Sequence, residues 1–355
     1  MAQAVAQRVT PYQQWQKGEG LPIYTGSNVN DLSKAEVKMW PRINQKAAFI
    51  NLAEQEHDDG WLIEIAPGGQ TEPIHHMFEA TYFVVGGRGA TTVWQPGKPK
   101  MTVEWQPGSL FSPPINAHYQ HFNLDGQNPA RLFAGTVCPQ VMNIFRNPNY
   151  LFNDTYVFED RFSGEEDEFF TDPGKSVATR KWQTNFIPNL RTFQLESWVE
   201  RGAGGSNMFF SMAGNSMSAH VSEFPPGTYK KAHRHGAGAE IVVLSGIGYS
   251  LLWKKGEKPQ KVDWKDLSLV SPLDQQYHQH FNSGPEPARY LAFTFGGNAS
   301  EVNRGGSGGA DVSEREGGWQ VEYEDQAPLV HELFSAECKK NGATVTQPEP
   351  TYRKD

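Results

Sequence analysis

The chain has 355 residues, of which 32 are Lys or Arg and 40 are Asp or Glu, so its formal net charge is −8. This balance argues against partners such as nucleic acid or an anionic membrane, and a mean hydropathy of −0.60 without a long apolar run argues against a membrane-spanning segment. The 35 glycines, 24 prolines and 12% aromatic residues are typical of a β-rich protein with many tight turns.

The N-terminal segment MAQAVAQRVTPYQQW lacks the basic and apolar regions of a secretion signal. The only cysteines, Cys138 and Cys338, are too few for a disulfide framework or a cysteine-based zinc site. We therefore expect a cytoplasmic protein with reduced cysteines.

Two stretches of the chain match at a constant separation of 159 residues. The matching pairs include His76/His235, Gly87/Gly246, Trp94/Trp253, Trp105/Trp264 and His121/His280. One residue is then lost, and Pro129-Ala130-Arg131 returns as Pro287-Ala288-Arg289. Two copies are too few for a solenoid, so the repeat indicates two domains of one fold that arose by internal duplication.

Both copies alternate short apolar segments with turns. The segments are TYFVVGG, ATTVWQPG, MTVEWQPGS and ARLFAGT in the first copy, and EIVVLSG, YSLLWKKG, KVDWKDLS and ARYLAFT in the second. Their β-branched and aromatic residues, bounded by Gly, Pro and Asp, predict strands of five to seven residues. We expect an all-β fold in which each repeat is a small sandwich or jelly roll.

These patterns divide the chain into an N-terminal domain with an arm, a connector, a C-terminal domain and a polar tail, over residues 1–140, 141–190, 191–300 and 301–355. A strand is expected around Phe193–Val199. In the tail, Pro328–Lys340 is expected to form a short helix that ends at Asn341-Gly342. Its apolar face would carry Leu329, Val330, Leu333 and Phe334.

Most histidines lie in four short clusters inside the repeats, at positions 75, 76, 118, 121, 233, 235, 278 and 280. Residues i and i+2 of a strand share a face, so His233 and His235 can both reach one metal ion at about 2.0–2.1 Å. A third ligand can arrive from the segment His278-Gln279-His280. Three neutral imidazoles suit Fe(II), Mn, Ni, Cu or Zn and leave coordination positions open for substrate or dioxygen.

The patterns Gly227-x5-His233-x-His235 and His278-x3-Asn282, with Gly246 between them, resemble the two cupin motifs. The chain thus resembles a bicupin, which implies two tandem cupin β-barrels, each a double-stranded β-helix or jelly roll. HRHGAGAEIVVLSGIG and YHQHFN are most similar to the metal-binding strands of gentisate 1,2-dioxygenase-like three-histidine bicupins. This resemblance implies His233, His235 and His278 as the ligands of one metal ion. Strand parity leaves His280 open as the third ligand instead.

Most cupins add a glutamate after the second histidine, and Glu240 has the longer of the two usual spacings from His235. Counted back from Gly246, however, Glu240 lies on the strand face opposite the barrel unless a bulge intervenes. It is therefore a possible fourth ligand, and the alternative is a glutamate at the surface or rim.

Other side chains are candidates to line the metal site: His280, Gln276 and Tyr229. Lys230 and Lys231 precede the ligand strand, where they either steer an anionic substrate to the mouth or are solvated lysines.

The first copy has lost this histidine set, because Ile74 stands where His233 does and Tyr119 where His278 does. Only His76 and His121 keep inward positions, and two histidines rarely hold a metal tightly. We expect a structural N-terminal barrel with a degenerate metal site. The alternative is that His76, Tyr119 and His121 form a polar core or bind a small ligand. Gentisate dioxygenases, by contrast, keep their metal in the N-terminal cupin.

The resemblance implies a non-haem Fe(II) dioxygenase for a small hydroxylated aromatic or an enolisable dicarbonyl. The alternatives are a non-oxidative metal-dependent lyase, isomerase or hydrolase, and a small-molecule-binding bicupin without turnover. One intact and one eroded site favour an enzyme. Expected partners are a small-molecule substrate, dioxygen and a second copy in a homodimer, without nucleic acid or membrane.

Overall fold

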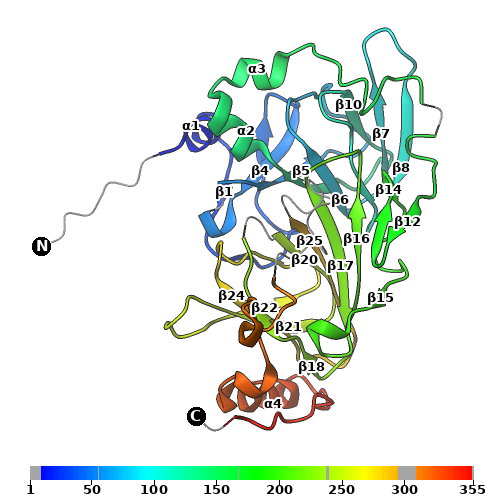
Figure 1. Ribbon diagram of the computed structural model, residues 1–355. Helices are drawn as coiled ribbons and strands as arrows, with labels where there is room; N and C mark the ends of the chain where they lie inside the picture. The colour runs from blue at the N-terminus through cyan, green and yellow to red at the C-terminus, as the bar shows by residue number, and fades with distance from the viewer. Residues whose placement is uncertain (1–8, 55, 167, 237–239, 295–308, 354–355) are drawn as a thin grey trace, which may run out of the picture.

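The computed structural model describes residues 9–54, 56–166, 168–236, 240–294 and 309–353. Strands dominate this part of the chain and form two domains, one above the other in Figure 1. Each domain consists of a large and a small sheet whose inner faces enclose a barrel-like interior.

The N-terminal domain has its large sheet built from β1 (Ile23–Tyr24), β3 (Lys38–Trp40), β4 (Gln45–Ile50), β5 (Asp59–Ile65), β6 (Ala80–Gly86), β9 (Leu110–Phe111), β11 (Ala130–Thr136) and β14 (Phe186–Ile187). Its small sheet consists of β7 (Gly89–Trp94), β8 (Met101–Trp105) and β10 (His118–Asn123).

The C-terminal domain has the corresponding pair. Its large sheet contains β2 (Asn28–Val29), β12 (Lys175–Ala178), β13 (Lys181–Gln183), β15 (Glu196–Ser197), β16 (Ser206–Ser211), β17 (Ser218–Phe224), β20 (Glu240–Ser245), β23 (Leu269–Val270) and β25 (Ala288–Thr294). Its small sheet contains β18 (Thr228–Tyr229), β19 (Ala232–His233), β21 (Ile247–Trp253), β22 (Gln260–Lys265), β24 (Tyr277–Asn282) and β26 (Gln320–Val321).

Helices are short and peripheral: α1 (Pro11–Gly18), α2 (Cys138–Phe145), α3 (Pro148–Asn153) and α4 (Pro328–Lys340), with 3-10 turns at Leu52–Glu54, Val199–Arg201, Glu314–Glu316 and Tyr323–Asp325. None of the described helices is long and apolar enough to cross a membrane. Cys138 and Cys338 are buried and free.

The two large sheets pack against each other between the domains. Phe133 of β11 and Phe293 of β25 meet there, with ring centroids 5.6 Å apart. Strand alternation in β25 places Leu291 and Phe293 in the core shared with the N-terminal domain. It places Tyr290 and Ala292 in a separate core inside the C-terminal barrel. Each strand of this layer therefore has one face toward the other domain and one toward its own barrel.

Segments outside each barrel add a strand to the sheet of the other domain. The N-terminal arm supplies β2 to β23 of the C-terminal domain, and the connector supplies β14 to β9 of the N-terminal domain. Arg131 donates hydrogen bonds to the carbonyl oxygens of Leu32 and Ala35, and Arg289 does the same to Leu190 and Phe193. The duplicated pattern thus extends into the two arms, which cross the boundary between the domains.

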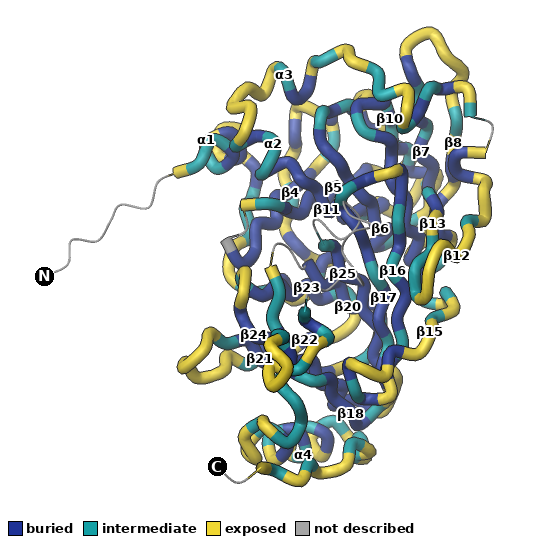
Figure 2. Tube along the Cα trace, in the orientation of Figure 1, coloured by how far each residue is buried: buried dark blue, intermediate teal, exposed yellow. Residues whose placement is uncertain are grey.

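The C-terminal tail covers the outer face of the small sheet in the C-terminal domain. Phe334 and Cys338 of α4 are buried there against Tyr229, Tyr249 and Phe281. The sequence places Leu329 on the same helix face, which is wrong, because Leu329 is 69% exposed. Figure 2 shows the exposed surface of α4 against the buried strands. Of the tail expected over 301–355, residues 301–308 and 354–355 lie outside the described part.

Candidate metal centre

Three histidines converge in the C-terminal barrel. One potential ligand nitrogen from each of His233, His235 and His278 lies within 4.8 Å of the other two. The ring centroid of His278 is 4.1 Å from that of His233 and 4.8 Å from that of His235. Among the described residues this is the only such group of histidine, cysteine or carboxylate side chains.

The fold brings these histidines together through antiparallel pairing. His233 of β19 stands directly opposite His278 of β24. The start of the motif is fixed by Gly227, whose φ of 67° favours glycine and whose added β-carbon would lie 1.9 Å from the Thr344 carbonyl oxygen. Asn282 closes the second motif by donating hydrogen bonds to the carbonyl oxygens of Phe224 and Pro225.

A backbone carbonyl orients each ring. The Nδ1 atoms of His233, His235 and His278 lie 3.4, 3.2 and 3.1 Å from the carbonyl oxygens of Lys231, Gly236 and Gln276. A carbonyl only accepts, so Nδ1 carries the hydrogen in each contact and the lone pair is left on Nε2. Histidine ligands of protein metal sites are oriented in this way.

Burial keeps the three rings neutral. It is the main cause that lowers the pKa of His235 to about 4 and the pKa values of His233 and His278 well below the usual range. The other rings and the Arg201 guanidinium lower them further. Neutral imidazoles with fixed tautomers are the form that binds a divalent metal, so these residues fit such an ion.

Glu240 is not part of this cluster. It is 1% exposed and points across the domain boundary, where a β-carbon added to Gly60 would lie 3.2 Å from its Oε2. Burial, together with the charges of Asp58 and Asp59, raises its pKa well above the usual range. The possible fourth ligand and the rim glutamate are therefore both wrong, because strand alternation turns Glu240 toward the N-terminal domain.

Tyr229 also lies elsewhere. Its ring packs outside the barrel against Phe281 and Phe334, and its hydroxyl contacts Nδ1 of His331. The reason is a one-residue shift in the pairing with β24, between Tyr229↔Phe281 and His233↔His278. This bulge changes the face of the strand on which Tyr229 lies, so the prediction that Tyr229 lines the metal site is wrong.

The two other candidates lie near the cluster. Nδ1 of His280 is 2.8 Å from the Ser250 hydroxyl, and its ring centroid is 5.5 Å from that of His278. His280 therefore lies inside the barrel but outside the convergent group. Gln276 contacts His278 through its backbone carbonyl, while its side-chain oxygen accepts a hydrogen bond from the Leu273 amide.

The same bulge turns Lys230 into the barrel. Both predictions for Lys230, a position at the mouth and a solvated side chain, are therefore wrong. The side chain is 1% exposed, and its Nζ donates to the Tyr290 hydroxyl at 3.1 Å. Burial lowers its pKa. Arg201, paired with Asp311 at 2.9 Å, is a second buried cation that sequence reasoning missed, because it lies outside the repeat motifs. Lys231 instead pairs with Glu322 at 2.6 Å.

The N-terminal barrel has a hydrogen-bonded core in the corresponding place. His76 Nε2 is 2.7 Å from the Tyr119 hydroxyl, which is 2.8 Å from the hydroxyl of Tyr82. Burial lowers the pKa values of His76 and His121 to about 3. His121 Nδ1 contacts Thr91 at 2.7 Å, as His280 contacts Ser250 in the other copy. Tyr119, which stands at the repeat position of His278, is therefore a hydrogen-bonded part of this core.

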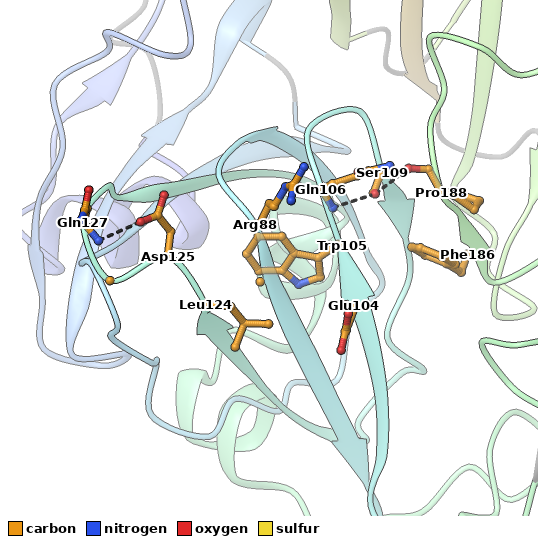
Figure 3. A pocket seen from close by; sticks show the side chains of 12 residues that line it. Arg88, Glu104, Trp105, Gln106, Ser109, Leu124, Asp125, Gln127, Phe186 and Pro188 are labelled. Carbon is orange, nitrogen blue, oxygen red and sulfur yellow. Dashed lines mark hydrogen bonds between the residues drawn. The ribbon is translucent and has the colours of Figure 1, made fainter.

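A cleft of about 970 Å³ lies on the surface of the N-terminal domain, beside the connector. Figure 3 shows Arg88, Trp105, Asp125 and Pro188 along it. No group of potential metal ligands was found here within the described part of the chain. The chemistry of this cleft is therefore less specific than that of the histidine cluster.

No family model matches the chain, and no curated protein matches it. Solved structures do. An oxalate decarboxylase studied for its substrate binding mode matches with a TM-score of 0.50 at 12% identity, over 77% of both chains. The Bacillus subtilis oxalate decarboxylase studied for its Mn(II) centres matches at 0.50 and 14%, over 77% of this chain and 78% of that one. The Lactobacillus farciminis enzyme in a formate complex matches at 0.50 and 13%, over 76% and 86%.

These matched proteins are bicupins. This chain has the bicupin fold. The fold class expected from the duplication is thereby confirmed, because the chain is mostly β-strands and consists of two tandem barrels. Identities of 12–14% show the fold alone, so the closer resemblance of this chain to gentisate dioxygenases stays a prediction.

Proposed function

We propose that the C-terminal barrel is a metal-dependent active site and that the chain is a non-haem Fe(II) dioxygenase. Its substrate would be a small hydroxylated aromatic or an enolisable dicarbonyl compound. The observation that supports this most is the convergence of His233, His235 and His278, each oriented by a backbone carbonyl, without a carboxylate in the group.

The absence of Glu240 from the group affects the choice of chemistry. Three neutral ligands leave the charge of a divalent ion unbalanced, so the site favours a substrate that chelates through phenolate or enolate oxygens. A glutamate ligand would have supported a non-oxidative lyase instead. Glu240 faces the other domain, which favours the dioxygenase.

The protein contributes geometry and a dry interior. His233, His235 and His278 would hold the ion, which when bound supplies the redox chemistry for dioxygen. The carbonyls of Lys231, Gly236 and Gln276 hold the rings in place. His233 and His278 are 6% and 2% exposed, so the surrounding barrel excludes most water from them.

The test is oxygen uptake by Fe(II)-loaded protein with catechol, gentisate and a β-diketone. We expect uptake with at least one compound, and its loss in His233→Ala and in His278→Ala. His76→Ala is the matched control, because His76 occupies the equivalent of His235 in the other barrel. Equal substrate turnover under argon would contradict the dioxygenase.

A Mn-dependent lyase is the second candidate. It is favoured by the matched structures, which are named oxalate decarboxylases, one of them studied for its Mn(II) centres. The same three histidines would hold the metal. This candidate predicts release of CO2 from a small dicarboxylate such as oxalate by Mn-loaded protein without net oxygen consumption, lost in His278→Ala.

A further inference from the structure

A row of polar side chains crosses the large sheet inside the C-terminal barrel. Asn207 of β16 stands directly opposite Ser222 of β17, which stands directly opposite Tyr290 of β25. Residues paired in this way point to the same face, and Tyr290 belongs to the core inside the barrel. Asn207 and Ser222 are both 0% exposed.

Several buried polar groups on this face have no hydrogen-bond partner in the part of the chain that the structure describes. No hydrogen bond among the described residues reaches the amide nitrogen or oxygen of Asn207 or the Ser222 hydroxyl. The same holds for Nδ1 of His220, which lies two residues before Ser222 on β17. Polar groups buried without a partner are costly and uncommon. Several of them on one inward face are therefore expected where a polar ligand binds.

Lys230 reaches the same place from the small sheet. Its Nζ donates to the Tyr290 hydroxyl and lies 4.9–5.5 Å from the ring centroids of Tyr290, Phe224 and Trp198. Within the described part of the chain, no carboxylate lies within ion-pair distance of this ammonium, whereas Arg201 nearby has Asp311. The charge of Asp311 favours the Lys230 ammonium, but Asp311 forms its ion pair with Arg201. A buried ammonium without an ion-pair partner of its own is unfavourable unless an anion accompanies it.

The row adjoins the histidine cluster. The Lys230 backbone amide donates to the His280 carbonyl at 3.0 Å, and the Tyr290 ring centroid is 5.3 Å from that of His280. His280 in turn lies beside His278. A divalent ion on three neutral histidines, added to Lys230, leaves the barrel interior strongly positive.

We propose that Lys230, Asn207 and Ser222 bind the carboxylate of an anionic substrate whose opposite end reaches the histidine cluster. This inference rests on the proposed function for the position of that opposite end. The carboxylate oxygens accept hydrogen bonds from Lys230 Nζ, Asn207 Nδ2 and the Ser222 hydroxyl, so that two donors without a partner among the described residues, Asn207 Nδ2 and Ser222, gain one. Lys230 is thus a specificity-determining residue for acids over their neutral analogues.

The decisive variant is Lys230→Met, which keeps the length of the side chain and removes its charge. Lys231→Met is the matched control, because the neighbouring Lys231 is held by Glu322 instead. The full-length protein loaded with Fe(II) under argon is titrated calorimetrically with salicylate and malonate, and with their neutral amides salicylamide and malonamide. Metal content per chain is measured for each variant.

We expect at least one of the acids to bind wild type at least tenfold more tightly than its amide. Lys230→Met should lose that preference, and Lys231→Met should keep it. Equal affinities of wild type and Lys230→Met for the acids, or no preference for acid over amide in wild type, would overturn the proposal. If either of these results came with a normal metal content, the carboxylate site would be rejected while the proposed metal centre would still stand. A carboxylate preference in protein without metal would support the anion site and count against the metal centre.

Ser222→Ala provides a second test that does not depend on Lys230→Met being well folded. Removing an unpartnered buried hydroxyl should raise the thermal unfolding midpoint of the ligand-free protein while weakening binding of the acid severalfold. A lower midpoint with unchanged binding would show a structural role for Ser222 and contradict the proposal.

Discussion

At the scale of single residues, strand alternation predicts the direction in which Glu240 points, but the residues around its carboxyl group belong to the N-terminal domain. Counting back from Gly246 predicts that it faces away from the barrel interior, and it does. What it faces is set by the packing of the two large sheets, which brings it to Gly60. Burial there, together with the charges of Asp58 and Asp59, raises its pKa. No local pattern reveals such a neighbour, because the two segments lie far apart in the sequence.

Replacing Glu240 by Gln should leave metal content unchanged and stabilise the protein above neutral pH. The raised pKa means that wild-type Glu240 is protonated in the folded state while the unfolded chain is ionised, so its contribution to stability is lost as pH rises. Glutamine resembles the protonated form at every pH. We expect a gain on the order of 2 kcal/mol at pH 8 and little difference at pH 4, measured by urea unfolding. Loss of the metal in this variant would restore Glu240 as a ligand.

The directions of the Lys230 and Tyr229 side chains could not be predicted from the sequence. The i, i+2 spacing predicts that His233 and His235 share a face, whereas the choice of His278 over His280 as the third histidine comes from the resemblance to bicupins. The bulge between Tyr229 and His233 exchanges the inward and outward positions of Tyr229 and Lys230. Nothing in the residues Thr228–Lys231 marks that bulge, so the buried ammonium emerges only from the structure.

At the scale of elements, the strands of both repeats follow from their alternating apolar pattern, whereas the exchanged arms do not. Arg131 and Arg289 bind the arms through backbone carbonyls. Such contacts need no particular side chain in the arm, so Leu32–Ala35 and Leu190–Phe193 share little sequence. The backbone pairing in the structure is therefore the evidence that the duplication extends into the arms.

Helix α4 offers a test of how the tail stabilises the C-terminal barrel. Phe334 is fully buried against Tyr229 and Phe281, so Phe334→Ala should cost about 3–5 kcal/mol of unfolding free energy. Leu329→Ala, on the exposed side of the same helix, should cost less than about 0.5 kcal/mol. Denaturant unfolding measures both values. Equal losses would show that the tail does not pack as described.

At the scale of the whole molecule, burial of histidines dominates the pH dependence. Lowered pKa values are found for His76, His121, His220, His233, His235, His278 and His280. These rings are neutral when folded but protonate near pH 6.5 when unfolded, so their contribution is present above that pH and is lost as pH falls. Asp58 and Asp59, whose pKa values burial raises to about 7, and Glu240, whose pKa burial raises well above its usual range, act in the opposite direction.

Because more histidines than carboxylates are involved, the unfolding free energy of the metal-free protein should fall from pH 6.5 to pH 4. The expected slope is about 1.4 kcal/mol per pH unit for each net proton taken up on unfolding. Urea unfolding at several pH values in the presence of chelator measures it. Greater stability at pH 4 than at pH 6.5 would mean that the rings are not buried as neutral groups. The homodimer expected from the sequence stays a prediction beside this one.

The proposed function requires that His233, His235 and His278 hold one metal ion. Elemental analysis of protein purified without added metal or chelator tests it most directly, with His278→Ala and the control His280→Ala measured in parallel. We expect about one divalent metal ion per chain in wild type and in His280→Ala, and its loss in His278→Ala. Metal-free wild type, or metal retained in His278→Ala, would contradict the claim.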